Sequence, residues 1–353
     1  MAFFQAATLY TTTTGRRRVR VSTLGLATTR VPADVYRLAD LGTVAAVMTR
    51  AAISDLEDPS EGSLHNARSR VLHKCVSMLA NYRLYTTARS SPAGQLILPE
   101  SLQLLPLFCL SLRKGRMFRS SGVPFRAPFP TADERAYHIF YERTTSPDSS
   151  LMRVHPNLLL VSDMPMRDGE WIAPSRLENS SGHRDERVVA ASMSPVCQLP
   201  KSMNPSIACL DEGGMYVLND RFAFYLFVGK DVPEEKWREL LGVSSQPGAQ
   251  RVNGQWASNV PLGEMSVAST EAGGKLRGIL RQLRRLNSPN PAAAMTVRPV
   301  HAPPVLVFVG RGSVFEEEMD GLLVDDPVDR EKSYVDFLCD VHRAVREKST
   351  ENF

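Results

Sequence analysis

The stretch Ser333-Tyr-Val-Asp-Phe-Leu-Cys-Asp-Val-His-Arg-Ala-Val-Arg-Glu347 decides how the fold is predicted. Ser333 is a suitable N-cap, and Asp336 follows three residues later. Apolar residues recur at helical spacing and form one stripe: Tyr334, Phe337, Leu338, Val341 and Val345. Because such a stripe has to be buried, we expect this helix to dock on an earlier part of the chain.

The composition is that of an ordinary globular protein. The chain has 353 residues, 43% of them hydrophobic and 23% charged, which is enough for about two or three domains. Residues 1–160 hold 20 Lys and Arg against 11 Asp and Glu, whereas the remainder holds 22 against 27. A basic first half suits an acidic partner, and a solvated basic face is the alternative interpretation.

The five cysteines are widely spread and include no C-x-x-C pair, which argues against a disulfide framework and a zinc module. Cys75, Cys109 and Cys339 lie in apolar helical patterns, so we expect them in the core. We expect no signal peptide. The longest apolar run, Leu102–Leu112, is too short to cross a membrane, so any membrane contact would be peripheral.

The chain opens with a predicted β-hairpin. Strands are expected at Phe3–Thr11 and Arg16–Leu24, joined by a turn that contains Gly15. Alternation places Val19, Val21 and Thr23 on one apolar face. Because a lone hairpin is marginal in water, we expect the rest of its sheet to belong to sequence ahead of Met1.

A series of helices follows and predicts an all-α bundle. Tyr137 and Phe140 are expected to point inward, and Thr131 with Glu134 has capping-box spacing. A kink is expected at Pro106. The predicted helices are Ala33–Ile53, Ser63–Tyr85, Pro99–Leu112 and Thr131–Arg143.

From about Asp163 the pattern becomes mixed and predicts an α+β domain that the Ser333 helix completes. Long loops are expected at 176–204 and 244–274. The predicted strands are Gly214–Leu218, Phe222–Val228, Met295–Val300 and Val305–Val309, and the predicted helices are Glu234–Leu241, Lys275–Leu286 and Val314–Met319.

Several separated segments resemble one known family, in that family's order. They are Leu9-Tyr-Thr with Arg17-Arg-Val-Arg-Val-Ser-Thr-Leu, Pro99-Glu-Ser-Leu-Gln-Leu-Leu-Pro-Leu-Phe, Asp133-Glu-Arg with Leu151-Met-Arg-Val-His-Pro-Asn-Leu, Asp211-Glu-Gly-Gly-Met-Tyr-Val-Leu, and Leu322-Leu-Val-Asp-Asp with Ser333-Tyr-Val-Asp-Phe-Leu-Cys. Together they resemble the C-terminal part of the cargo-adaptor subunit of the COPII vesicle coat (Sec family, member twenty-four).

The resemblance implies a multidomain fold. It implies the end of a β-sandwich at residues 1–30, a helical domain at 31–162 and a gelsolin-like α+β domain at 163–353. The family's zinc module and large trunk domain would lie ahead of these regions, so no cofactor is expected in this chain.

The resemblance also implies a non-catalytic role. A coat adaptor gathers cargo sorting signals of membrane proteins at the endoplasmic reticulum, on the cytoplasmic side, and pairs with the GTPase-activating coat subunit. It contacts an anionic membrane peripherally. The family's best-defined cargo pockets lie in the trunk, so none of its binding residues is carried over here.

Arg16, Arg18 and Arg20 form the sharpest basic feature, expected on one face of a strand. An acidic membrane or cargo tail is one ligand for them, and solvated arginines are the alternative. Nucleic acid is disfavoured because no aromatic residues interleave with these arginines.

Several other residues are candidate sites. Cys339 and His342 could pair as a thiol nucleophile and base, but no orienting acid or oxyanion donor accompanies them. The helix Lys275–Leu286 could lie on anionic lipid, or cover a sheet with its leucines. Trp171 and Trp256 could anchor a partner peptide, or fold back on their own domain.

Three alternatives to a coat adaptor remain from the sequence. One is the sister coat subunit, which stimulates a small GTPase. Another is an actin-binding gelsolin-repeat protein, and the third is a thiol hydrolase that uses Cys339.

Overall fold

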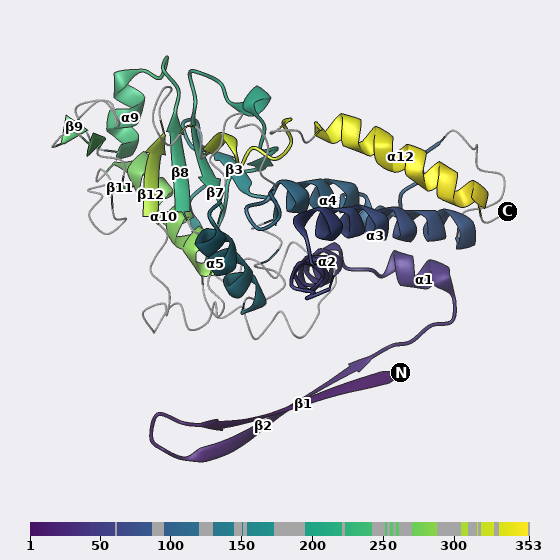
Figure 1. Cartoon of the computed structure of the whole chain (residues 1–353). Helices are drawn as coiled ribbons and strands as arrows, with labels where there is room; N and C mark the ends of the chain where they lie inside the picture. Colours follow the sequence, from purple (N-terminus) through teal and green to yellow (C-terminus); the bar gives the residue numbers. More distant parts are fainter. Residues whose placement is uncertain are drawn as a thin grey trace.

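The computed structural model arranges the chain as a hairpin, a group of helices and a mixed sheet flanked by helices (Figure 1). It describes residues 1–60, 62–86, 95–119, 130–144, 150, 154–172, 195–220, 223–241, 251–252, 255–256, 259–260, 270–287, 305–309, 316, 319–327 and 332–351.

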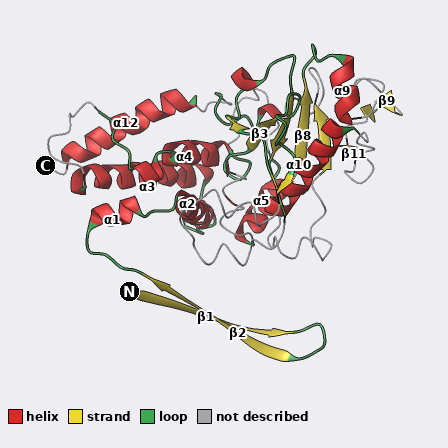
Figure 2. Cartoon of the chain, turned by 180° about the vertical axis from the view of Figure 1, so that it is seen from behind, coloured by secondary structure: helices red, strands yellow, loops and turns green. Residues whose placement is uncertain are grey.

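The predicted hairpin is confirmed. Strands β1 (Ala2–Thr11) and β2 (Arg17–Leu26) pair antiparallel along their whole length. Gly15 closes the turn at a φ of 79°, a conformation that favours glycine. In the described part of the chain this sheet has two strands, and both views show it extending away from the other elements (Figures 1 and 2).

The first predicted helix is two helices. Asp40 accepts a hydrogen bond from the Thr43 backbone N–H at 2.7 Å, so it caps the start of a new helix rather than continuing an old one. The helices are α1 (Pro32–Arg37) and α2 (Leu41–Leu56). Val35 of α1 and Leu38, the residue that follows it, are exposed.

The predicted kink at Pro106 is also wrong. A 3₁₀ turn, η1 (Glu100–Leu102), precedes α4 (Leu105–Lys114), and Pro106 lies in the first turn of α4. In the first turn of a helix the backbone N–H groups have no partner within the helix, so the missing N–H of proline costs nothing there. Pro106 therefore starts the helix instead of bending it. Helix α3 (Leu64–Tyr85), capped by Ser63, is as predicted.

Helix α5 (Ala132–Arg143) has the predicted capping box between Thr131 and Glu134. Its inward face is not the predicted one: Tyr137 is 53% and Phe140 64% exposed, whereas His138, Tyr141 and Glu142 are buried.

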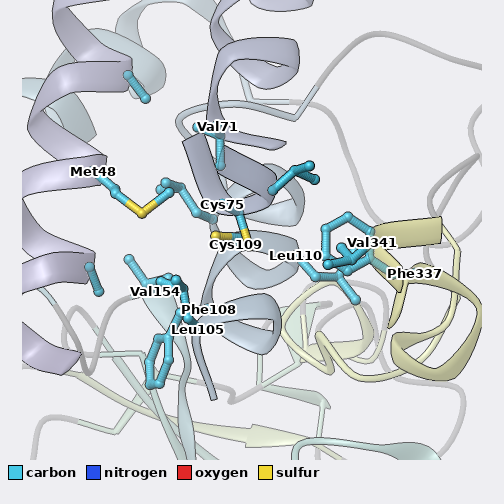
Figure 3. Close-up of a cluster of buried hydrophobic side chains, with 14 of the residues drawn as sticks. Met48, Val71, Cys75, Leu105, Phe108, Cys109, Leu110, Val154, Phe337 and Val341 are labelled. Carbon is cyan, nitrogen blue, oxygen red and sulfur yellow. The ribbon is translucent and has the colours of Figure 1, made fainter. Parts of the chain in front are cut away.

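The helices α2, α3 and α4 enclose one apolar core (Figure 3). Cys75 of α3 and Cys109 of α4 lie side by side within it, as predicted for two of the three cysteines. The third, Cys339, is exposed, so that prediction is wrong.

The last helix, α12 (Tyr334–Glu351), docks on this core. Its residues Phe337, Val341 and Val345 are buried among side chains of α3 and α4, so the predicted stripe and its docking are confirmed. The expectation that α12 completes the α+β domain is wrong, because α12 lies along α3 and α4 (Figures 1 and 2). We call α1 to α5 with α12 the helical block.

The α+β part is built on a six-stranded sheet of order β11-β12-β8-β7-β3-β6, in which β12 and β8 are parallel and the other pairs antiparallel. Its strands are β3 (Asn157–Leu160), β6 (Ser202–Met203), β7 (Met215–Asn219), β8 (Ala223–Val228), β11 (Asn259–Val260) and β12 (Val305–Val309). Strand β3 was not predicted, and it lies ahead of the expected domain limit at residue 163.

Smaller elements complete this part. They are β4 (Trp171–Ile172), β5 (Val196–Cys197), the 3₁₀ turn η2 (Ile207–Cys209), α9 (Glu234–Leu241), β9 (Arg251–Val252), β10 (Gln255–Trp256) and α10 (Glu271–Asn287). The strand expected at Met295–Val300, most of the helix at Val314–Met319, and most of both predicted loops lie outside the described residues.

Each face of the sheet has its own core. Helices α9 and α10 cover one face, where Leu276, Ile279, Leu280 and Leu283 are buried (Figure 2). Met319 and Leu323 cover the other face. The prediction that α10 covers a sheet is therefore confirmed.

Candidate functional site

The hairpin exposes both apolar and basic side chains along its two strands. Its register places Arg18 opposite Tyr10 and Arg20 opposite Thr8, so these four side chains share one face. The other face carries Leu9 opposite Val19. Exposed fractions are high for the apolar residues of both faces: Phe3 70%, Phe4 58%, Leu9 66%, Val19 62% and Val21 56%.

Two of the three predicted arginines share a strand face, and the third lies outside the strand. Arg18 and Arg20 lie on one face of β2, whereas Arg16 precedes the strand, where its backbone N–H donates to Thr12 Oγ1 at 3.1 Å. An arrangement of this kind can accept further strands at its edges and anionic groups at its arginines.

A buried seam joins the helical block to the sheet. Lys114, at the end of α4, is 1% exposed, and its Nζ donates to the carbonyl oxygens of Val324 at 2.7 Å and Asp326 at 2.6 Å. A buried ammonium is costly unless it is hydrogen-bonded, and these carbonyls satisfy that need. Lys114 therefore fixes the segment 321–327, which leads towards α12.

The same segment is also held by the sheet side. The Asp326 carboxylate accepts hydrogen bonds from Ser206 Oγ at 2.7 Å and from the Ile207 backbone N–H at 2.6 Å. Arg119, also buried, donates from Nη2 to the Gly321 carbonyl at 2.6 Å. Segment 321–327 thus connects the two parts. Sequence reasoning missed the seam, because its contacts join residues about 200 positions apart.

Helix α10 offers no apolar face to lipid, because Leu280 is 1% and Leu283 0% exposed. The lipid-bound interpretation of this helix is therefore wrong. Trp171 is 42% exposed, and the Arg285 guanidinium lies 5.7 Å from its ring centroid, a cation–π contact. The Trp256 side chain lies outside the described residues.

In the described part of the chain, the Cys339 thiol and the His342 imidazole are not paired as nucleophile and base. Cys339 is exposed on α12, and His342 Nε2 is buried without a hydrogen-bond partner in the described part of the chain. No group of three His, Cys, Asp or Glu side chains suited to a metal occurs among the residues that the structure describes. None of the described helices is both long and apolar enough to span a membrane.

Comparison with protein families places the helices in a known group. Residues 40–152 match the model of the Sec23/Sec24 helical domain. These residues include α2 to α5, the helices that form most of the helical block.

Curated relatives extend the similarity over nearly the whole chain. Protein transport protein SEC24 C of Arabidopsis thaliana is 27% identical over 98% of this chain, and Protein transport protein Sec24C of Homo sapiens is also 27% identical over 98%. Protein transport protein sec24 of Schizosaccharomyces pombe is 30% identical over 78%. The chain spans 26% of the length of each of these relatives.

A solved structure has the same fold. The crystal structure of the human COPII-coat protein Sec24c superposes with a TM-score of 0.71 at 24% identity, covering 98% of this chain and 37% of the other. Together with the relatives, it confirms the resemblance to the C-terminal part of the COPII cargo adaptor that the sequence segments indicate.

Proposed function

We propose that this chain acts in the COPII coat as part of the cargo-adaptor subunit. It is similar to Sec24 protein transport proteins over 26% of their length. The observation that carries the proposal is the alignment to Sec24 relatives over 98% of the chain. The helical-domain match and the shared fold support it. In this role the chain binds proteins and performs no chemistry.

The partners follow from the same role. We infer that the complete adaptor pairs with the GTPase-activating coat subunit and gathers cargo sorting signals at the endoplasmic reticulum, on its cytoplasmic side. We infer that residues 1–30 are the end of a β-sandwich and that the hairpin pairs with further strands of that sandwich. Its exposed apolar residues, Val19 and Val21 among them, suit burial by such strands.

A chimaera tests the proposal. The matching quarter of the Schizosaccharomyces pombe relative is replaced by this chain, and the chimaera is expressed in cells depleted of their own protein. Export of secretory cargo from the endoplasmic reticulum should be restored. A chimaera with Val341→Asp, which disrupts the helical block, is the matched control and should fail. A chimaera that is expressed normally yet supports no export would refute the proposal.

The arginines of the hairpin supply the expected membrane contact. Vesicles containing anionic lipid should co-sediment more of the wild-type chain than of the triple variant Arg16→Gln, Arg18→Gln, Arg20→Gln, since each basic residue near such a surface contributes about 1 kcal/mol. Arg343→Gln with Arg346→Gln on exposed positions of α12 is the control. Equal losses of vesicle binding in the two variants would mean that the hairpin arginines have no specific role in membrane contact.

The sister subunit is the second candidate, because the matched helical-domain model describes both Sec23 and Sec24. The relatives named here are Sec24 proteins, which favours the adaptor. A GTPase assay with the cognate small GTPase separates the two, since the sister subunit should accelerate hydrolysis and the adaptor should not.

A further inference from the structure

Helix α10, on the outside of the sheet in Figure 2, carries two adjacent arginines that the proposed role does not use. Arg281 and Arg284 are three residues apart, so their side chains are neighbours on one face of the helix. Arg281 is exposed and Arg284 half-buried. They border Leu280 and Leu283, which are buried against the sheet.

No described group balances the charge of this pair. In the part of the chain that the structure describes, neither guanidinium takes part in a hydrogen bond or an ion pair, and Arg284 Nε is buried without a partner. Burial, and then repulsion by Arg281, lower the pKa of Arg284. The two positive charges therefore destabilise each other, and an anion bound to both would relieve that repulsion.

Two other cations of α10 do have partners. Lys275 Nζ lies 3.3 Å from Glu271 Oε1, and Arg285 Nη1 donates to the Pro195 carbonyl at 2.6 Å. The missing counter-charge is thus a property of the pair and not of the whole helix. Neither the family comparison nor the proposed coat role assigns a ligand to it.

An aromatic ring adjoins the pair. A Cβ built on Gly278 would lie 3.5 Å from Trp171 Nε1, and the Arg285 guanidinium lies 5.7 Å from the centroid of the same indole. Arg281 falls between these two positions on the helix. Because Trp171 is 42% exposed, its ring offers an apolar surface to a group that is attached to the anion.

Two guanidiniums beside an indole fit a doubly charged anion on a peptide. A phosphate dianion neutralises both charges and has oxygens for both guanidiniums, whereas a carboxylate carries one charge. A membrane surface fits less well, because the leucines of α10 are buried and cannot insert into lipid. We propose that Arg281 and Arg284 bind the phosphate of a phosphorylated serine in a partner peptide, with Trp171 contacting an apolar residue next to that serine.

The test titrates the 353-residue chain with the acetylated and amidated peptide Gly-Leu-phosphoserine-Leu-Gly, and follows binding by calorimetry and by backbone NMR shifts. The same peptide with serine or glutamate in the centre is the comparison. Saturable binding of the phosphopeptide is expected, with several-fold weaker binding of the glutamate peptide and none of the serine peptide. Inorganic phosphate should bind more weakly than the phosphopeptide, since it has no group for Trp171, and equal affinity would contradict the peptide assignment.

Variants locate the binding. Arg281→Gln and Arg284→Gln should each weaken phosphopeptide binding about tenfold or more, as expected for a hydrogen bond between charged groups. Neither should lower the unfolding midpoint, because each removes a repulsion and breaks no described hydrogen bond. Trp171→Ala should weaken binding of the phosphopeptide but not of inorganic phosphate. The matched control is Arg238→Gln on α9, whose arginine already pairs with Glu234, and it should leave binding unchanged.

Three results would overturn the proposal: no saturable binding of the phosphopeptide, equal binding of the serine peptide, or wild-type affinity in Arg281→Gln. Because Arg281 is exposed, its variant decides the matter even if Arg284→Gln fails to fold. A double variant that keeps phosphopeptide binding but loses binding to vesicles containing phosphatidic acid would assign the pair to a membrane instead. None of these measurements depends on coat activity, so the proposal can fail while the proposed function stands.

Discussion

The hairpin and α12 carry similar apolar patterns but differ in what covers them. On α12, Phe337, Val341 and Val345 are at most 3% exposed, because α3 and α4 complete the core around them. On the hairpin, Leu9 and Val19 are more than 60% exposed. In these two elements periodicity identifies an apolar face, whereas tertiary contacts decide whether a partner covers it.

Burial also separates the two elements energetically. Each buried apolar side chain of α12 contributes about 1.5–3 kcal/mol, and the Lys348 Nζ adds a hydrogen bond to Ser77 Oγ at 2.6 Å. The hairpin's exposed side chains contribute little until other strands cover them. The predictions that follow test this contrast, beginning with the largest effect.

A charge placed on each element should give opposite outcomes. Val341→Asp buries a carboxylate in the helical core, and it should lower the free energy of unfolding by about 4 kcal/mol or more. Val19→Asp should change it by less than about 0.5 kcal/mol, because the position is exposed. Urea denaturation followed by circular dichroism measures both. Similar losses from the two variants would break the comparison.

The seam lysine should matter more than a surface lysine near the same helix. Lys114→Met leaves the carbonyls of Val324 and Asp326 without their donor, at a cost of about 1–3 kcal/mol. The control is Lys332→Met, which loses an ion pair between the 55% exposed Lys332 and Asp340 and should cost about 0.5 kcal/mol or less. Unfolding midpoints compare the two, and equal effects would contradict the role of the seam.

The capping aspartate makes stability depend on pH. Hydrogen bonds from the Thr43 side chain and then its backbone lower the pKa of Asp40 below its ordinary 3.8. As pH falls, the carboxyl of Asp40 is therefore protonated at a higher pH in the unfolded chain than in the folded one. Asp40 adds stability above about pH 4, and that contribution is lost as pH falls through the lowered pKa. Asp40→Asn keeps a cap but removes this titration. Between about pH 5 and about pH 3, the free energy of unfolding should fall more in the wild type than in the variant. Parallel curves of unfolding free energy against pH would contradict the account.

The hairpin turn should show the smallest effect. Gly15→Ala puts a side chain at a φ of 79°, which costs about 1 kcal/mol locally. Because the hairpin packs on no other described strand, the global unfolding midpoint should not move, and only amide exchange within β1 and β2 should increase. A shift in the global midpoint would mean that the hairpin supports the rest of the fold.

Much of the fold could be predicted from periodicity and capping residues. Ser63 and Thr131 mark the starts of α3 and α5, and the leucines of α10 identify its buried face. Patterns of this kind act over a few neighbouring residues, which is why sequence alone contains them.

Errors arose where long-range contacts choose between two suitable faces. On α5, Arg135 donates to the carbonyl of Arg119 at 3.1 Å, which turns its neighbours His138 and Glu142 inward and leaves Tyr137 and Phe140 outside. No local rule predicts that choice. Similarly, the carbonyl partners of Lys114 follow more than 200 residues later, so the seam could not be predicted.

The docking of α12 is the central claim, and native-state hydrogen exchange tests it most directly. The account predicts that amides of α12 around Val341 exchange as slowly as those of α3 around Cys75, because one core buries both. Amides of β1 and β2 should exchange much faster. Fast exchange throughout α12, at the rate of the hairpin, would contradict the account.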